Sequence, residues 1–520
     1  MRIRILYAVI LCLSLFPGCR QEQSAQDNWW QMRGLVLSTK ELAEVDWPEL
    51  AKRSGINTIG THITPSEVTA FLTTPEGKEF QRKCRKYGIT VEHQLHAMGE
   101  LLPRELFSED STMFRMNADG RRTADFNCCV HSKKALDIIA ANAAKFAKIL
   151  RPGNHRYYFW LDDNKPVCQC PECAALSPSE QALIVENRML RAIRKTDPRA
   201  KLAHLAYSFF MPAPRKVVPD EGIFLEFAPI YRSWDVPLTQ EDALCPRGYP
   251  VTNGDNLRWL EENLEVFPAE DAVVLEYWVD ASLFSRWKRP AVKLPWHPDV
   301  CASDLATYAG YGLHNVTSFA VYMDAEYFGR FPSTAPIEEY GRMLESFRHY
   351  PHLNDPWYGR EDATRVSFCR SADALEFRFD VKDSTLTVCR GEGERTVDDS
   401  DRAELFISCD PEMQLYYGFE MDPAGKVMDY RNSFYRQFDY GWDSGIMPVS
   451  TILPDGYRVE VSLPYAFLRS AGIQPEGPLH IGLYRADATG TGDINWFTLE
   501  DPHTPEPDFH VPASLITIDY

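Results

Sequence analysis

The stretch that most constrains the fold reads RYYFWLDDNKPVCQCPEC and spans residues 156–173. It begins with an apolar, aromatic run typical of a buried strand, and the run stops at two adjacent aspartates. Similar short apolar runs recur along the chain, and helix-like stretches with apolar residues at spacings of three and four lie between several of them. Together the runs cover residues 33–39, 56–64, 88–97, 155–163, 200–209, 222–230, 272–280 and 315–323.

Strands that alternate with helices predict βα units and a parallel sheet. Eight units favour a (β/α)8 barrel of the TIM type over an open doubly wound sheet, because no glycine-rich nucleotide loop follows the first strand. We therefore predict an α/β fold in which residues 31–350 form the barrel. Later in the chain, short alternating runs separated by Asp, Gly and Pro predict an antiparallel β-sandwich over residues 355–520.

The N-terminus combines a positively charged start with an apolar stretch that ends at Phe16. The stretch is too short to span a bilayer, so residues 1–18 are predicted to be a signal peptide. The residues around Cys19 resemble a bacterial lipobox, which predicts lipidation of Cys19 and a tether over residues 19–30. We expect an exported lipoprotein at the cell surface or in the periplasm of a Gram-negative bacterium, attached to the membrane by this anchor.

The overall composition narrows the choice of partners. The chain has 520 residues, a formal net charge of −19 and no run rich in Lys and Arg. A protein of this charge has no electrostatic attraction to phosphate backbones, so we expect no nucleic-acid partner.

A barrel places its active site at the carboxyl ends of its strands, so the polar residues there are the candidates. Carboxylates hydrogen-bond hydroxyl groups and transfer protons, while aromatic faces stack on pyranose rings. This combination favours a glycoside hydrolase. The candidate substrate-binding residues at the strand ends are His62, His93, His96, Asn164, Tyr207, Glu226, Tyr231, Arg232, Glu276, Trp278, Tyr322 and Asp324.

Asp162 and Asp163 are the candidate catalytic pair, because carboxylates that emerge from packed structure are unfavourable unless they are used or paired. In a substrate-assisted reaction, one aspartate orients a 2-acetamido group whose oxygen attacks the anomeric carbon, and its neighbour protonates the leaving group. In the ordinary two-carboxylate reaction, Asp163 acts with Glu226 or Glu276. The structural alternative is that Asp-Asp-Asn forms a turn or a helix cap.

Three cysteines with the spacing C-x-C-x-x-C follow the aspartates directly. Three thiolates this close can bind a structural zinc ion with a fourth ligand from Cys128, Cys129 or His131, whereas export makes a disulfide to Cys128 or Cys129 equally consistent. Catalytic zinc is disfavoured because all-thiolate sites are closed, so we expect catalysis to require no cofactor. The candidate metal ligands are Cys168, Cys170 and Cys173.

Several motifs of the predicted barrel resemble glycoside hydrolase family 163, formerly a domain of unknown function. They are FRMNADGRR (114–122), NCCVHS (127–132), LDDN with its trailing CQCPEC, and EFAPIYR (226–232). The resemblance implies an endo-β-N-acetylglucosaminidase that cuts the core of complex N-glycans by a substrate-assisted retaining mechanism, so a glycan or glycoprotein is the expected partner. By analogy with other acetamido-assisted hexosaminidase barrels, it implies that Asp162 orients the acetamido group and Asp163 is the general acid/base.

The C-terminal region resembles carbohydrate-binding module family 9. The similar segments are DDSDRAELFISCD (398–410), YYGFEMDPAGKVMDYR (416–431) and INWFTLEDP (494–502). The resemblance implies aromatic residues that clamp a sugar, with Trp442 and Trp496 as candidates and core packing as the alternative for each. The alternative to an enzyme is a non-catalytic surface glycan-binding protein whose barrel captures a glycan without cutting it.

Overall fold

The computed structural model describes residues 28–519. The predicted signal peptide, the predicted lipidation at Cys19 and most of the predicted tether lie outside the described residues. Within the described part of the chain, no helix has the length and apolar character needed to cross a membrane.

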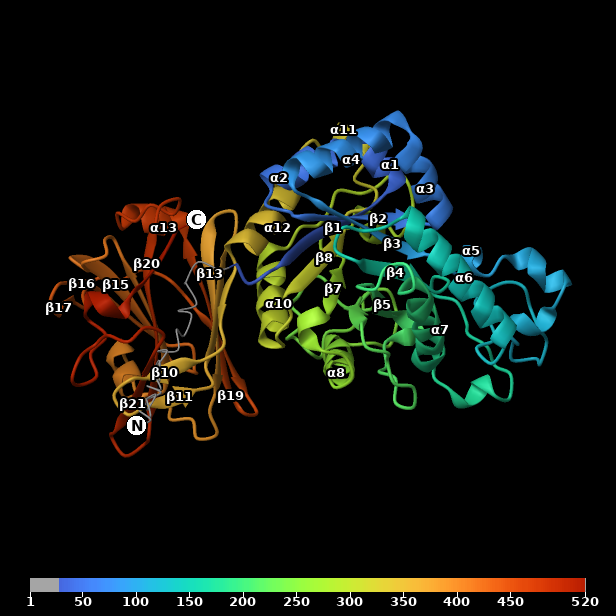
Figure 1. Ribbon diagram of the computed structural model, residues 1–520. Helices are drawn as coiled ribbons and strands as arrows, with labels where there is room; N and C mark the ends of the chain where they lie inside the picture. Colours follow the sequence, from blue (N-terminus) through green and yellow to red (C-terminus); the bar gives the residue numbers. More distant parts are fainter. Residues whose placement is uncertain (1–27, 520) are drawn as a thin grey trace, which may run out of the picture.

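Eight parallel strands close into a barrel in chain order, and β8 pairs back with β1 (Figure 1). The prediction of a TIM-type barrel is therefore confirmed. Most of the predicted runs extend past the carboxyl ends of these strands, because their last residues leave the sheet and form the mouth of the barrel. The strands are β1 (Met32–Ser38), β2 (Thr58–Ile63), β3 (Thr90–His96), β4 (Arg156–Trp160), β5 (Lys201–Ala206), β6 (Ile223–Phe227), β7 (Val273–Glu276) and β8 (Asn315–Phe319).

Helices connect the strands and cover the outside of the barrel (Figure 1). Their starts follow local sequence signals; α7, for example, begins at Pro178 because Ser177 and Glu180 form a reciprocal capping box. The helices are α1 (Thr39–Glu44), α2 (Trp47–Arg53), α3 (Pro65–Thr73), α4 (Pro75–Tyr87), α5 (Met98–Leu101), α6 (Lys133–Ile149), α7 (Pro178–Ile193), α8 (Asn253–Leu264), α9 (Ala281–Phe284), α10 (Pro298–Gly310), α11 (Ala325–Arg330) and α12 (Ala335–Ser346).

Two antiparallel sheets form the predicted sandwich, which is likewise confirmed. The larger sheet has the order β11-β10-β21-β20-β14-β15-β16-β17, with β22 paired to β20, and the smaller has the order β18-β19-β13-β12-β9. Their elements are β9 (Arg348–Tyr350), β10 (Leu353–Asp355), β11 (Arg360–Asp362), β12 (Arg365–Arg370), β13 (Ala374–Lys382), β14 (Arg402–Ser408), β15 (Leu415–Met421), β16 (Val427–Ser433), β17 (Gln437–Asp439), β18 (Val449–Leu453), β19 (Gly456–Pro464), α13 (Tyr465–Ser470), β20 (Leu479–Ala488), β21 (Ile494–Thr498) and β22 (Ile516–Ile518).

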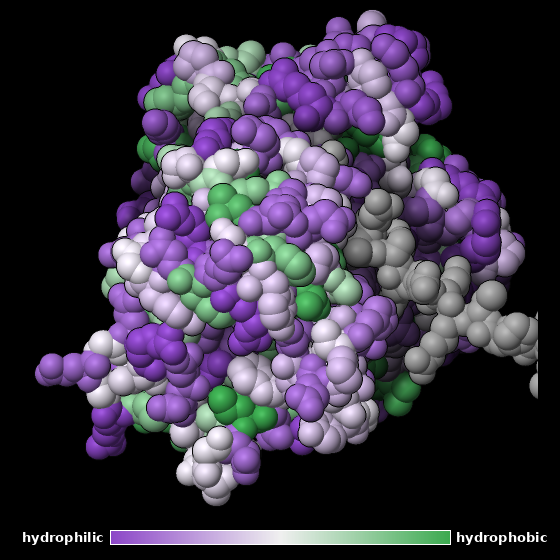
Figure 2. Space-filling view, turned by 90° about the vertical axis from the view of Figure 1, so that its left-hand side faces the viewer, coloured by the Kyte–Doolittle hydropathy of each residue, from purple (hydrophilic) through white to green (hydrophobic). Residues whose placement is uncertain are grey.

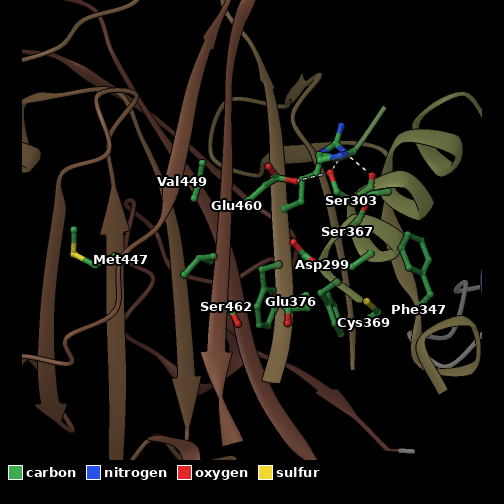
Figure 3. Close-up of a pocket in the computed structure, with 17 residues that line it drawn as sticks. Asp299, Ser303, Phe347, Ser367, Cys369, Glu376, Met447, Val449, Glu460 and Ser462 are labelled. Atoms are coloured by element: carbon green, nitrogen blue, oxygen red, sulfur yellow. Dashed lines mark hydrogen bonds between the residues drawn. The ribbon is translucent and has the colours of Figure 1, made fainter. Parts of the chain in front are cut away.

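The smaller sheet packs against the barrel through α10 and α12 (Figure 1). Arg378 on β13 is buried at this junction and donates to the Ser303 carbonyl and the Thr307 hydroxyl of α10, both at 2.8 Å. The Ser303 hydroxyl in turn donates to Glu460 on β19 at 2.8 Å. A cavity of about 260 Å³ lies between the two domains here (Figure 3). Buried hydrogen bonds of this kind hold the sandwich in one orientation on the barrel wall.

The face of the sandwich that looks away from the barrel is mostly hydrophilic (Figure 2). Hydrophobic residues on this face occur in small separate groups rather than in one large patch (Figure 2). Scattered apolar residues are normal on a protein surface and do not indicate a docking site.

Candidate active site

A pocket of about 430 Å³ lies at the mouth of the barrel. This volume is in the range typical of small-molecule sites. Three carboxyl-bearing residues line it, Glu41, Asp163 and Asp280. Its aromatic walls are formed by Trp160, Tyr207, Tyr277, Trp287, Phe319 and Tyr322.

Asp163 lines the pocket at the point where the chain leaves β4. Its side chain is 59% exposed, and its Oδ1 accepts a hydrogen bond of 3.1 Å from the Tyr207 hydroxyl. The Nε2 atom of His96 lies 4.0 Å from the same oxygen. A carboxyl group that reaches both the pocket and solvent can exchange a proton with a ligand and then with water.

Asp162 is not among the residues that line the pocket. Its carboxylate pairs with Arg104 and accepts the backbone N–H of Asn127 at 2.6 Å, and its own N–H donates to the Asn127 side-chain oxygen at 3.0 Å. The Asn127 amide also donates to the carbonyls of Lys165 and Pro166. Asp162 therefore joins two loops beside the pocket, and its role toward the substrate stays a prediction.

Two histidines from neighbouring strands line the pocket, His62 on β2 and His96 on β3. Each ring uses Nδ1 to bind a backbone carbonyl, that of Gln94 at 2.8 Å for His62 and that of Leu161 at 3.0 Å for His96. Burial, with a further contribution from His96, lowers the pKa of His62 to about 4. A neutral His62 whose Nδ1–H is already used presents Nε2 as an acceptor for a ligand hydroxyl.

Asp280 is the second aspartate on the pocket, and it is 3% exposed. It caps α9, where its Oδ1 accepts the backbone N–H of Ser282 at 3.1 Å and the Ser282 hydroxyl at 2.8 Å. Burial raises the pKa of Asp280 to about 7. A carboxyl group with a pKa near neutrality, in a cleft, is a candidate for proton transfer or for charge stabilisation.

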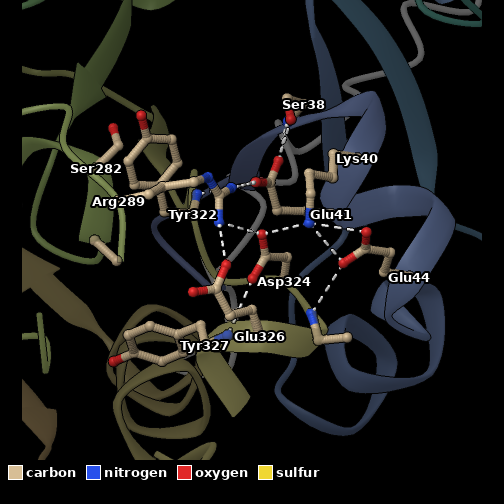
Figure 4. Close-up of polar contacts among 12 residues, drawn as sticks. Ser38, Lys40, Glu41, Glu44, Ser282, Arg289, Tyr322, Asp324, Glu326 and Tyr327 are labelled. Atoms are coloured by element: carbon tan, nitrogen blue, oxygen red, sulfur yellow. Dashed lines mark hydrogen bonds and ion pairs between the residues drawn. The ribbon is translucent and has the colours of Figure 1, made fainter. Parts of the chain in front are cut away.

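An ion-pair network forms one side of the pocket (Figure 4). Lys40 and Arg289 both line the pocket, and each places a nitrogen 2.7 Å from Oδ2 of the buried Asp324. Glu41 accepts the backbone N–H of Tyr322 at 3.0 Å, and the Arg289 guanidinium lies 4.2 Å from the centre of the Tyr322 ring. Tyr322 therefore lines the pocket, as the sequence predicted. Asp324 does not line the pocket but holds Lys40 and Arg289 in place through its ion pairs.

Three of the predicted residues, His93, Glu276 and Trp278, are buried and do not line the pocket. Glu276 accepts the hydroxyl of Tyr308 at 2.5 Å, and the Trp278 indole donates to Asp304 at 3.0 Å; both partners lie on α10. Side chains alternate along a strand, so residues next to the inward-facing ones point toward the helices. This alternation corrects the predicted placement of His93 and Glu276 at the mouth. Trp278 follows the end of β7, and its indole points to α10 instead of the mouth.

Glu226 and Arg232 are buried away from the pocket as well. Glu226 faces the barrel interior, where it accepts the Trp160 indole N–H at 2.7 Å, and burial raises its pKa well above the ordinary value. Arg232 pairs with Glu276 and Asp304, each at 2.8 Å. These groups form polar networks in the barrel wall and interior, so the predicted pairing of Asp163 with a strand glutamate has no geometric support.

Asn164 and Tyr231 lie on a rim next to Tyr207 without lining the pocket. The Asn164 side-chain oxygen accepts the Ser208 hydroxyl at 2.6 Å, and the Tyr231 hydroxyl lies 3.3 Å from the same group. The predicted residues that the fold does bring together on the pocket are Asp163, His62, His96, Tyr207 and Tyr322.

Sequence reasoning missed a set of pocket residues that come mainly from the first strand end and from a late loop. Ser38 and Glu41 form a capping box, so the S-x-x-E pattern at the end of the first strand was a usable signal. Trp287 and Arg289 had no such signal, because they belong to the segment between α9 and α10 that only the fold carries to the mouth.

The predicted metal ligands lie on the segment between β4 and α7, which also carries the aspartates. Cys168, Cys170 and Cys173 are buried, and the fold brings Cys129 to them. Cys128 is not part of this group. None of these cysteines lines the pocket.

In the sandwich, Trp442 and Trp496 lie apart. Trp442 packs on Tyr417 with 5.0 Å between ring centroids, and Trp496 packs in the cluster that contains Tyr416. Tyr416 and Tyr417 are neighbours on β15 and belong to different hydrophobic clusters, so they face opposite sides of the sheet. The two tryptophans therefore do not clamp one sugar ring. Trp496 is one of the residues that line a cavity of about 250 Å³, and Trp442 is not.

Residues 48–250 match the model of a family described as a domain of unknown function, DUF4838. Among curated proteins, none matches this chain. A β-N-acetylhexosaminidase from Bacteroides fragilis is similar to this chain with 10% identity and a TM-score of 0.38, over 60% of this chain and 65% of that one.

Two further solved structures are similar to parts of the chain. A GH18 chitinase from Pseudoalteromonas aurantia shows 10% identity and a TM-score of 0.30, over 56% of this chain and 96% of that one. A family 9 carbohydrate-binding module from Caldicellulosiruptor kristjanssonii in complex with cellotriose shows 15% identity and a TM-score of 0.24, over 32% of this chain and 80% of that one. With TM-scores this low, these likenesses establish no function for the chain.

Proposed function

We propose that this protein is a glycoside hydrolase that cleaves glycans containing N-acetylglucosamine. The observation that carries the proposal is the mouth of the closed barrel, where Asp163 and Asp280 share one aromatic-walled pocket. Carboxyl groups supply the proton transfers and charge stabilisation that glycosidic cleavage needs. Aromatic faces such as that of Trp160 provide surfaces on which a pyranose ring can stack.

The proposed reaction is substrate-assisted and retaining. Asp163 is the general acid/base, because its exposed side chain can protonate the departing sugar oxygen and later accept a proton from water. Asp280, buried at the pocket, accepts the N–H of the 2-acetamido group and, as a carboxylate, stabilises the positive charge that develops when the acetamido oxygen attacks the anomeric carbon. Asp162 takes no part in these steps; it positions the Asp163 loop through Asn127.

We propose the core of complex N-glycans as the substrate, as the resemblance to glycoside hydrolase family 163 implies. Cleavage there would leave one N-acetylglucosamine on the glycoprotein and release the rest of the glycan. The proposal includes export and attachment to the membrane through a lipid on Cys19, which radiolabelled palmitate incorporation tests against a Cys19→Ser variant that should not be labelled.

A second mechanism is supported by the raised pKa of Asp280, which reaches about 7. A carboxyl group that is about half protonated near pH 7 can act as the general acid of an ordinary two-carboxylate glycosidase, with Asp163 as the nucleophile or base. The two mechanisms differ in their need for the substrate's acetamido group. Only the first predicts inhibition by a thiazoline analogue of the cyclised intermediate and no turnover of substrates that lack the acetamido group.

The test is incubation with a complex-type N-glycoprotein followed by mass spectrometry of the products. Wild-type protein should release glycan, and Asp163→Asn should lower the rate by about 10²–10⁴-fold, the usual contribution of a general acid/base. Asp119→Asn is the control, because Asp119 has a side chain that is 70% exposed and does not line the pocket. Glycan binding with no turnover on any N-acetylglucosamine substrate would instead show a capture protein and would overturn the proposal.

A further inference from the structure

The geometry points to a structural zinc site formed by Cys129, Cys168, Cys170 and Cys173. One ligand comes from the loop before α6 and three come from the loop after β4. All four side chains are buried, and their sulfur atoms lie within 4.8 Å of one another. This inference does not depend on the proposed function.

The spacing of the sulfur atoms fits a tetrahedral ion. The Sγ atom of Cys129 lies 3.8 Å from that of Cys170 and 3.8 Å from that of Cys173. Two Zn–S bonds of about 2.3 Å that meet at the tetrahedral angle place their sulfur atoms about 3.8 Å apart. A disulfide holds its sulfur atoms at about 2.0 Å. Four thiol groups that converge on one point therefore match a metal better than two covalent pairs.

The surroundings of the sulfur atoms also suit thiolate ligands. The backbone N–H of Met116 donates to the Cys168 sulfur at 3.3 Å, and the Arg122 guanidinium lies 3.7 Å from the same atom. The Nδ1 atom of His131 lies 3.2 Å from the Cys173 sulfur. N–H groups and a cation around a thiolate cluster offset the negative charge that four such ligands bring to a divalent ion.

The same geometry identifies Cys129 as the fourth ligand, in preference to Cys128 and His131, which are close to it in the sequence. His131 lies within hydrogen-bonding distance of a cysteine sulfur and is not part of the four-residue group. Cys128 is buried but equally outside that group. A site with four thiolates and no open position is structural in type, which agrees with its place outside the pocket.

The ion would act on the active site through position alone. Cys129 follows Asn127 by two residues, and Asn127 bonds both Asp162 and the carbonyls of Lys165 and Pro166. Tying Cys129 to the cysteines after β4 therefore holds these two loops together beside the mouth. A long loop has no packed core of its own, so the bound ion would stabilise its conformation instead.

The test uses the full chain without its signal peptide, purified from zinc-supplemented medium, with elemental analysis by mass spectrometry. We expect about one zinc per chain for wild type and for Cys128→Ala, and loss of the zinc in Cys129→Ala. Replacement of zinc by cobalt should give the absorption bands of tetrahedral thiolate coordination. Equal zinc content in wild type and Cys129→Ala would overturn the proposal.

A second measurement covers the case in which the ligand variant does not fold. Wild-type protein is denatured without reductant in the presence of a chelator, and its free thiols are alkylated and mapped by mass spectrometry. We expect all four cysteines to be alkylated and the chelated native protein to melt at a lower temperature. Disulfides among these four cysteines, or protein that carries no zinc and takes up no cobalt, would show a disulfide or thiol cluster and overturn the site.

Discussion

Replacing Asp280 with asparagine should make the protein more stable at neutral and alkaline pH while it removes activity. Burial raises the pKa of Asp280 from its ordinary value of 3.8 to about 7. Between these two pH values the folded protein holds a proton on Asp280 that the unfolded chain has released. The free energy of unfolding therefore falls as pH rises through this window, because the unfolded state binds fewer protons.

The size of the effect follows from the two pKa values. A rise from 3.8 to about 7 corresponds to about 4 kcal/mol, at about 1.4 kcal/mol per pH unit. Most of this loss is complete by pH 7, and about 2.5 kcal/mol of it falls between pH 5 and pH 8. Asparagine keeps a side-chain oxygen for the two hydrogen bonds from Ser282 and carries no charge. The variant should therefore escape the loss.

The assay is urea unfolding of wild type and Asp280→Asn at several values between pH 5 and pH 8, followed by circular dichroism. The helical signal reports mainly on the barrel, because the barrel contains helices α1 to α12. The difference between the two proteins should grow by about 2.5 kcal/mol across this range, while Asp119→Asn should stay parallel to wild type. Parallel curves for Asp280→Asn would refute the inference that this carboxyl group is buried with a raised pKa.

Two further predictions concern buried charges away from the pocket. Arg232→Ala should lower the free energy of unfolding of the barrel by about 3–5 kcal/mol, because it leaves Glu276 and Asp304 buried without their cation; an unchanged urea midpoint would contradict the network. Arg378→Ala should loosen the junction between the domains by removing the hydrogen bonds to Ser303 and Thr307. Faster amide hydrogen exchange in α10 and β13 would show this effect; wild-type exchange rates would argue against it.

The barrel could be predicted from local pattern because each of its parts is encoded locally. Strand runs such as 155–163 are apolar and short, the helices between them have a period close to that of an α-helix, and the order of elements leaves few ways to close the sheet. The same logic located the mouth, since carboxyl ends of parallel strands share one side. Asp163, His62 and His96 were found in this way, and all three line the pocket.

The sequence did not show which residues of each strand point into the barrel and which point toward the helices. His93 and His96 belong to one strand, yet only His96 reaches the pocket. A strand buried on both sides shows no alternation of polar and apolar residues, so the sequence does not reveal which face is the barrel interior. Glu276 was misplaced for the same reason, whereas Trp278 lies past the end of β7.

The sequence by itself determined the two folds, the position of the barrel mouth and the presence of a cysteine-rich loop after the aspartates, because these depend on residues close to one another in the chain. Tertiary structure alone decided which groups meet. It paired Asp162 with Arg104 and brought Asp280 to the same pocket that Asp163 lines. It also selected Cys129 over Cys128 as the fourth member of the cysteine group. Such choices depend on distances across the fold and on the direction of each side chain, and spacing along the chain carries neither.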